Sequence, residues 1–122
     1  MSSVKLDLLI AEFPEERGAL TRFFEYLANS SGRHIELTVG RIYDLITPSS
    51  LTVLAAILFR LEQEALITKV VRVESDGMGG IGDFNSIIDV PETIYDSRLG
   101  KNIDVRFDQI NLIYKPAINS LN

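Results

Sequence analysis

The sequence predicts an α+β fold in which helices come first and short strands follow. Apolar residues recur at helical spacing through the first half of the chain, and after Leu66 the apolar period changes to two. A chain of 122 residues is enough for one domain. We therefore predict a single domain, with a core of helices and a hairpin at about residues 15–90 and a β-rich extension at residues 91–122.

The first of three predicted helices begins at Pro14 and ends near Gly32. Pro14 is followed by two glutamates, a favourable opening because acids near the start of a helix face the positive end of its dipole. The apolar residues of this segment recur at helical spacing: Leu20, Phe23, Phe24, Leu27 and Ala28. Gly32 suits the left-handed conformation that ends many helices. The preceding run, Val4 to Phe13, fits either a short helix or a strand.

The second and third predicted helices are joined by a very short turn. Thr38 can cap a helix that runs to Ile46 and stops before Pro48, and His34 to Leu37 alternates like a short strand. Ser49 or Ser50 can cap the third helix, which runs from Leu51 to about Ala65. Only Thr47, Pro48 and Ser49 separate the two helices, and this is the turn length of a helix-turn-helix.

The second half of the chain predicts a β-hairpin followed by further short strands. Val71 and Val73 alternate with polar neighbours, and Phe84 to Val90 forms the returning strand. The segment between them, Gly77 to Gly82, contains four glycines and predicts a mobile loop. Three later segments predict strands that extend the hairpin sheet or form a small layer beside it: Thr93–Tyr95, Ile103–Val105 and Ile110–Tyr114.

The most distinctive run of the chain is Arg60-Leu61-Glu62-Gln63-Glu64-Ala65-Leu66-Ile67. With the elements from Arg17 to about Val90, it resembles the winged-helix superfamily, in which a third helix passes directly into the first strand of a β-hairpin wing. The resemblance implies a three-helix bundle with a wing, here with an additional short C-terminal β-layer. Ala65 stands where many members carry Gly, and the segment after the wing is longer and richer in strands than usual. The resemblance implies DNA recognition or protein assembly, because the fold serves both.

Composition limits the kinds of site and partner. The chain has no Cys, which excludes disulfides and thiolate metal sites and is compatible with the cytoplasm. We expect a soluble, cytoplasmic protein without a membrane partner, because no secretory signal or run long enough to cross a bilayer is present. The net charge is -5 and no basic arm or stripe occurs, which disfavours nucleic acid as a partner.

None of the motifs in the chain predicts a catalytic, cofactor or metal site. Gly77, Gly79 and Gly82 have dinucleotide-loop spacing, but the β-branched segment that follows lacks the helix that such a loop needs. His34 is the only histidine, which makes a transition-metal site or a Ser-His-Asp triad implausible. The paired acids, such as Glu62 and Glu64, are typical of a solvated face. We therefore expect no enzyme activity and no small-molecule substrate.

The third predicted helix is the most informative element. Residues Leu51, Leu54, Leu58 and Leu61 form one apolar stripe and are expected to face the core. Further residues lie off this stripe and are the candidates for binding a partner: Val53, Ala56, Ile57, Phe59 and Arg60. Either the C-terminal β-layer or another chain covers this second face.

Two interpretations of function follow. The leading one is a non-enzymatic winged-helix module that binds a protein partner or a second copy of itself. The alternative is a winged-helix transcriptional regulator that binds DNA. Its candidate DNA contacts are four basic residues: Arg41, Arg60, Lys69 and Arg72.

Overall fold

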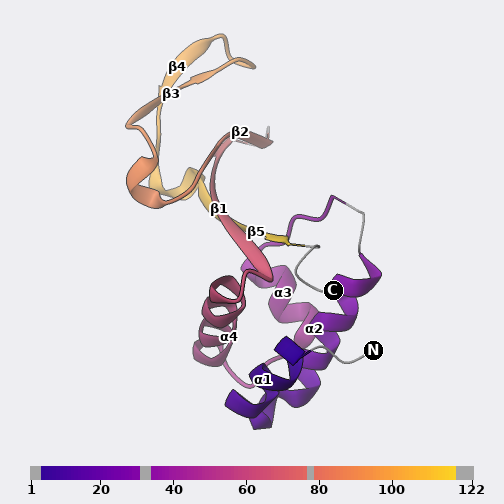
Figure 1. Cartoon of the computed structure of the whole chain (residues 1–122). Coiled ribbons are helices and arrows are strands. Elements are labelled where there is room, and N and C mark those ends of the chain that lie inside the picture. The colour runs from indigo at the N-terminus through magenta and orange to yellow at the C-terminus, as the bar shows by residue number, and fades with distance from the viewer. Residues whose placement is uncertain (1–3, 31–33, 77–78, 118–122) are drawn as a thin grey trace. The chain divides into compact units, whose positions relative to one another are not determined.

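The structure is a computed structural model that describes residues 4–30, 34–76 and 79–117. The chain forms two compact units (Figure 1). The helical unit comprises Met1–Thr68 and Lys115–Asn122, and the β unit comprises Lys69–Tyr114. The borders between the units therefore lie near residues 68 and 114.

The helical unit contains four α-helices among its described residues. They are α1 (Val4–Glu12), α2 (Arg17–Asn29), α3 (Val39–Ile46) and α4 (Leu51–Gln63). The ambiguous first segment is therefore a helix. Pro14–Glu16 forms a short 3-10 turn, η1, so that the next α-helix begins at Arg17 rather than at Pro14. The predicted end at Gly32 lies outside the described residues.

The predicted caps of α3 and α4 are confirmed. The hydroxyl oxygen of Thr38 accepts a hydrogen bond from the backbone N–H of Arg41 at 3.2 Å, and that of Ser50 accepts one from Val53 at 3.1 Å. These side chains satisfy backbone donors that have no partner within the first helical turn. The segment His34 to Leu37 contributes only an isolated β-bridge at Leu37 rather than a strand.

The turn between α3 and α4 is held by polar side chains from η1 and α2. A carboxylate oxygen of the buried Glu16 accepts a hydrogen bond from the backbone N–H of Ser49 at 2.8 Å. The guanidinium of Arg22 donates to the carbonyl of Ile46 at 2.7 Å. Thr47, which ends α3, has a φ of 45°, in the left-handed region. The two helices meet at 105°.

The core of the helical unit is apolar and draws on all four helices. Its fully buried side chains include Leu9, Leu20, Phe23, Leu27, Ile42, Ile46, Leu54, Ile57 and Leu61. The interpretation of α4 needs two corrections, because Leu51 is 68% exposed and Ile57 is fully buried. Leu51 and Ile57 lie about 60° to opposite sides of Leu54 around the helix axis, so spacing alone did not decide which of them enters the core.

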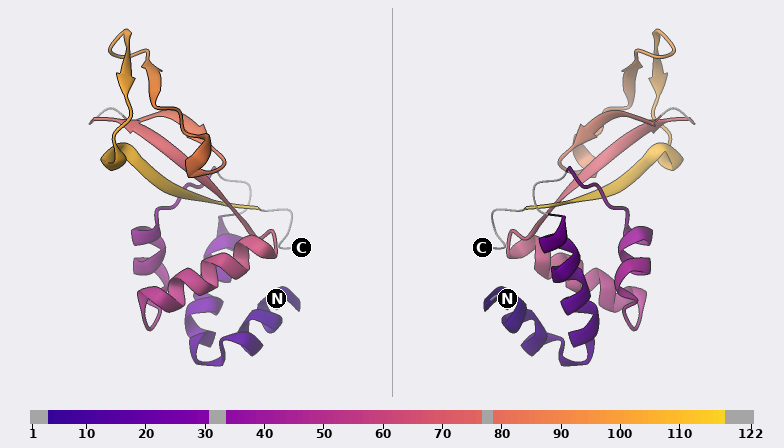
Figure 2. Two further views of the ribbon diagram at one scale, coloured as in Figure 1. Left: turned by 90° about the vertical axis from the view of Figure 1, so that its left-hand side faces the viewer. Right: turned by 90° about the vertical axis from the view of Figure 1, so that its right-hand side faces the viewer.

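The β unit contains a three-stranded sheet and a separate two-stranded sheet among its described residues (Figure 2). The larger sheet has the strand order β2-β1-β5, with bounds Gly79–Phe84, Ile67–Ser75 and Ile110–Pro116. The smaller is an antiparallel hairpin of β3 (Thr93–Asp96) and β4 (Lys101–Asp104). Both arrangements that the sequence allowed for the tail therefore occur. Strand β5 extends the sheet of the first hairpin, and β3 with β4 forms a separate sheet.

The returning strand of the first hairpin differs from the prediction. It comprises Gly79–Phe84, whereas Ile87–Asp89 is a 3-10 turn, η2. Gly77 and Met78, at the start of the predicted loop, lie outside the described residues. Gly79 to Gly82 are not a loop, because they pair with β1 in the register Val73↔Gly82 and Glu74↔Gly80, with Ile81 left over as a bulge.

Two glycines of β2 are explained by side chains that lie against the strand. A Cβ atom on Gly80 would lie 2.9 Å from Cδ of Arg72, and one on Gly82 would lie 2.8 Å from Cδ1 of Ile94. No ordinary Cβ atom approaches another atom so closely. These glycines therefore reflect packing within the β unit, and Gly82 lets the β3–β4 hairpin approach β2.

A buried carboxylate joins that hairpin to the end of β1. One oxygen of Asp96 accepts a hydrogen bond from the hydroxyl of Ser75 at 2.6 Å, and the other accepts one from the backbone N–H of Arg98 at 2.9 Å. These hydrogen bonds, that of Ser75 foremost, hold the pKa of the Asp96 carboxyl below its usual range, against the opposing effect of burial.

Candidate protein-docking face on α4

The exposed side of α4 is apolar and uncharged over most of its length. We define the outer face of α4 as its five exposed residues before Arg60: Leu51, Thr52, Ala55, Ala56 and Phe59. Phe59 is 61% exposed and Leu51 is 68% exposed. Single exposed apolar residues are common, and what marks a surface that another molecule covers is their grouping, as here, where the apolar residues share one side of a helix.

Apolar residues are exposed on α1 as well, at Val4 and Leu8, but there they stand beside the exposed acids Asp7 and Glu12, so the lack of charge is what distinguishes α4. On α2 the exposed residues include Arg17, Arg22 and Glu25, and on α3 they include Arg41 and Asp44. Both helices therefore present the charged groups that ordinarily solvate the surface of a helix. The outer face of α4 presents none, so exposure to water does not account for its sequence.

The structure places the five predicted partner-binding residues in four different environments. Ala56 and Phe59 lie on the outer face, whereas Val53 is half-buried. Ile57 has no exposed surface and is part of the core, so it is not available to a partner in this structure. The guanidinium of Arg60 is occupied by contacts within the helical unit. The candidate surface therefore excludes Ile57 and includes Leu51, which the sequence assigned to the core.

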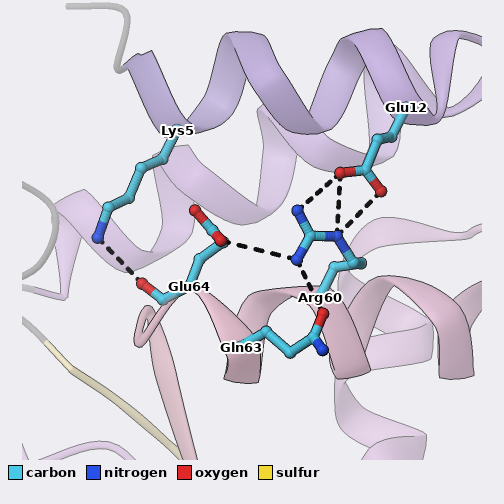
Figure 3. A network of polar contacts seen from close by, with 5 residues as sticks. All are labelled: Lys5, Glu12, Arg60, Gln63 and Glu64. Atoms are coloured by element: carbon cyan, nitrogen blue, oxygen red, sulfur yellow. Dashed lines mark hydrogen bonds and ion pairs between the residues drawn. The ribbon is translucent and has the colours of Figure 1, made fainter.

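Arg60 fastens α4 to α1 through a network of ion pairs (Figure 3). Its Nη2 and Nε donate to Oε1 of Glu12 at 2.7 and 2.9 Å, and Nε also lies 3.0 Å from Oε2. Its Nη1 donates to the Gln63 side chain at 2.8 Å and lies 3.6 Å from the carboxylate of Glu64. The hydrogen bonds from Arg60 lower the pKa of Glu12. Arg60 therefore holds α4 against α1, and it also adjoins the outer face in the sequence.

A second contact fixes the direction of α1 against α4. Nζ of Lys5 donates to the backbone carbonyl of Glu64 at 3.0 Å (Figure 3). Lys5 near the start of α1 thus meets the end of α4, while Glu12 meets Arg60 one turn earlier, and the two helices are antiparallel. No sequence signal predicted this pairing, because Glu12 and Arg60 are 48 residues apart.

The four basic residues proposed for DNA contact are divided between the two units. Arg41 is exposed on α3, and Arg60 is bound by Glu12. Lys69 and Arg72 belong to the β unit and are half-buried. Arg72 makes a two-pronged ion pair with Asp83 on the facing strand, with N···O distances of 2.7 and 2.9 Å. Carboxylates of the chain thus neutralise two of the four candidates.

A scan of protein-family models found no match, and searches of curated proteins and of solved structures found none either. The winged-helix resemblance thus rests on the residues and element order alone.

The remaining features of the described residues do not offer a stronger site. No group of three or more His, Asp or Glu side chains is placed to hold a metal ion in the part of the chain that the structure describes. No single helix there has the length and apolar character to cross a bilayer, and α3 with α4 meets that test only as a pair bent by 105°. A cavity of about 300 Å³ in the β unit is bordered by Asp76 and Arg106, but these two pair with each other at 2.7 Å.

Proposed function

We propose that this chain is a non-enzymatic interaction module that binds another protein through the outer face of α4. The observation that carries the proposal is the contrast between α4 and its neighbours. The exposed sides of α2 and α3 carry charged residues, whereas α4 exposes Leu51, Phe59 and two alanines without a charge before Arg60. Protein interfaces have cores that are depleted in charge and enriched in aromatic residues.

The order and geometry of the elements support a winged-helix architecture for this module. In that interpretation α2, α3 and α4 are the three helices, and β1 with β2 is the wing. The 105° angle between α3 and α4 lies within the roughly 90–120° found in helix-turn-helix pairs. The outer face of α4 then corresponds to the surface that a DNA-reading member would place in the major groove.

The helix-turn-helix geometry also favours a second candidate function, that of a DNA-binding regulator. A recognition helix reads bases with Arg, Lys, Asn, Gln, Ser or Thr. The outer face of α4 offers only Thr52 from this group, and Arg60 and Arg72 are held by carboxylates. A titration of labelled duplex tests this candidate: submicromolar affinity that falls linearly with salt on a double-logarithmic plot would favour DNA over protein as the partner.

The proposed function is tested by co-purification of the tagged chain from the cells that express it. We compare the wild-type chain with the variants Phe59→Glu and Phe107→Glu. Phe107 is the matched control because it is 88% exposed and lies in a 3-10 turn of the β unit, η3 (Phe107–Gln109). We expect Phe59→Glu to lower the recovery of a stoichiometric protein partner at least tenfold, because a carboxylate in an interface core is costly to desolvate.

The control distinguishes binding through α4 from nonspecific binding through any exposed aromatic residue. Phe107→Glu is expected to retain the partner at the wild-type level. Equal loss in both variants, or full retention in Phe59→Glu when circular dichroism shows both variants folded, would contradict the assignment of the site to α4.

A further inference from the structure

We propose that the occupant of the outer face of α4 is the same face of a second copy of this chain, in an antiparallel pair of α4 helices. The proposal rests on the proposed function and names its partner. The twofold axis of the pair passes between Ala55 and Ala56. Two arguments lead to this arrangement, one from the sizes of the side chains and one from the charges at the ends of the helix.

The side-chain sizes along the outer face are nearly the same in both directions. Leu51 lies near one end, Phe59 lies near the other, and Ala55 and Ala56 lie between them. In a twofold contact each copy presents the same residues to the other, so that the residues near one end of the face meet those near its other end. In the antiparallel pair each Phe59 packs over Leu51 and Thr52 of the other copy. The central alanines let the helix axes approach to about 8 Å, the lower end of the range for packed helices.

The charges at the ends of α4 favour the antiparallel over the parallel direction. The first turn of α4 contains no acidic residue that would offset the positive end of its dipole, and the buried carboxylate of Glu16 accepts the hydrogen bond from the N–H of Ser49, just before the cap at Ser50. Near the other end lies Glu62, on the flank that Leu51 and Ala55 share. An antiparallel pair places the carboxylate of Glu62 near the N-terminus of the other α4. A parallel pair would instead bring like ends together.

The net charge of the chain restricts where two copies can meet. Each copy carries a net charge of -5, which opposes association over most of the surface. The outer face of α4 has no charged residue, so repulsion is smallest there. A single helical face buries less than the roughly 800 Å² per partner of a standard interface. We therefore expect a weak dimer with a dissociation constant on the order of micromolar.

Sedimentation equilibrium of the purified full chain tests the association. The wild-type mass should rise from the 13.6 kDa of one chain toward twice that value as the concentration is raised from micromolar to millimolar. Phe59→Glu should raise the dissociation constant at least tenfold, and Phe107→Glu should leave it unchanged. A wild-type chain that stays at the mass of one copy up to millimolar concentration would overturn the proposal.

Single-cysteine variants test the direction of the pair and do not depend on the charged substitution. The chain has no Cys, so each variant carries one thiol. Ala56→Cys, beside the twofold axis, should form a disulfide-linked dimer faster than Ala28→Cys on the exposed side of α2. Leu51→Cys should also be slow, because the antiparallel arrangement separates its two copies by about 13 Å along the helix axis.

Equal rates for Ala56→Cys and Ala28→Cys would overturn the self-pairing, and faster linking through Leu51→Cys would overturn the antiparallel direction. These failures differ from a failure of the proposed function. If the wild-type chain stays monomeric and Phe59→Glu abolishes binding of a different protein, the proposed function stands. The second copy is then excluded as the occupant of the outer face.

Discussion

The end of α4 shows how one residue can adopt a conformation that its type disfavours. Ala65 has a φ of 57°, in the left-handed region. The backbone N–H of Leu66 donates to the carbonyl of Leu61 at 2.9 Å, and that of Ala65 donates to Glu62 at 3.0 Å. These two hydrogen bonds form the Schellman motif, in which the left-handed position is usually Gly. Burial of Leu61 and Leu66 beside this motif explains why the conformation persists without glycine.

Ala65→Gly should therefore stabilise the chain. An L-residue in the left-handed region costs about 1–2 kcal/mol, and the extra entropy of glycine in the unfolded chain offsets part of the relief. We expect a net increase of about 0.5–1 kcal/mol in the free energy of unfolding, measured by urea denaturation. Ala28→Gly, at an exposed helical position of α2, should instead lower the stability. A loss of stability in Ala65→Gly would contradict the assigned backbone conformation.

Gly82 should be the opposite case, a glycine whose replacement lowers stability. Gly82→Ala brings a methyl group to within 2.8 Å of Ile94, so either the side chain or the strand must shift. We expect a loss of about 1–3 kcal/mol, as for other overpacked positions. Gly40→Ala is the control, because a Cβ atom there meets nothing within 4 Å and α3 should gain about 0.5–1 kcal/mol. Urea denaturation of both variants makes the comparison. Unchanged stability in Gly82→Ala would show that the Ile94 side chain moves aside at little cost and that close packing does not require glycine here.

At the scale of elements, the hydrogen bond from Ser75 to Asp96 links β1 to the β3–β4 turn and should make stability depend on pH. The folded-state pKa of Asp96 lies below its ordinary value. Its contribution is therefore present above about pH 4, the ordinary range of an aspartate, and is lost as the pH falls through the lower folded-state value. Ser75→Ala removes the largest cause of the shift. We expect this variant to be less stable than the wild type at pH 7 and to differ from it less at pH 3.

Urea denaturation of both proteins at the two pH values measures this difference. A stability difference that stays constant between pH 7 and pH 3 would mean that the hydroxyl of Ser75 does not act through the ionised carboxylate.

Two substitutions test which side of α4 faces the core. Ile57→Ala should lower the free energy of unfolding by about 2–5 kcal/mol, because the side chain is fully buried. Leu51→Ala should change it by no more than about 0.5 kcal/mol, as is usual for an exposed position. Thermal melts of the two variants suffice. The reverse order would restore the stripe that the sequence predicted.

How far the sequence predicts these elements depends on how local their causes are. The caps at Thr38 and Ser50 were predicted because each bond joins residues three apart. The burial of Ile57 rather than Leu51 was not predicted. Which of the two residues is buried depends on where the core lies relative to α4. Likewise Gly79 to Gly82 were interpreted as a loop, since their reason for being glycine lies in Arg72 and in the later residue Ile94.

At the scale of the whole molecule, the α+β class and the order of helices before strands were predictable from the change of apolar period after Leu66. The two compact units were not, because β5 returns to pair with β1 from more than thirty residues later in the chain. The surface that we propose for docking was named in part from the sequence. Ala56 and Phe59 were named from their position off the core stripe, and Leu51 was missed because it was assigned to that stripe.

The central claim is that the outer face of α4 binds protein, and site-specific photo-crosslinking in the cells that express the chain tests it most directly. A photoreactive side chain is placed at position 56, on the outer face, and in a second variant at position 28, on the exposed side of α2. The account predicts a discrete protein adduct from position 56 that is absent from position 28, with the chain itself as the adduct if the paired arrangement is correct. No protein adduct from position 56, or the same adducts from both positions, would contradict the claim.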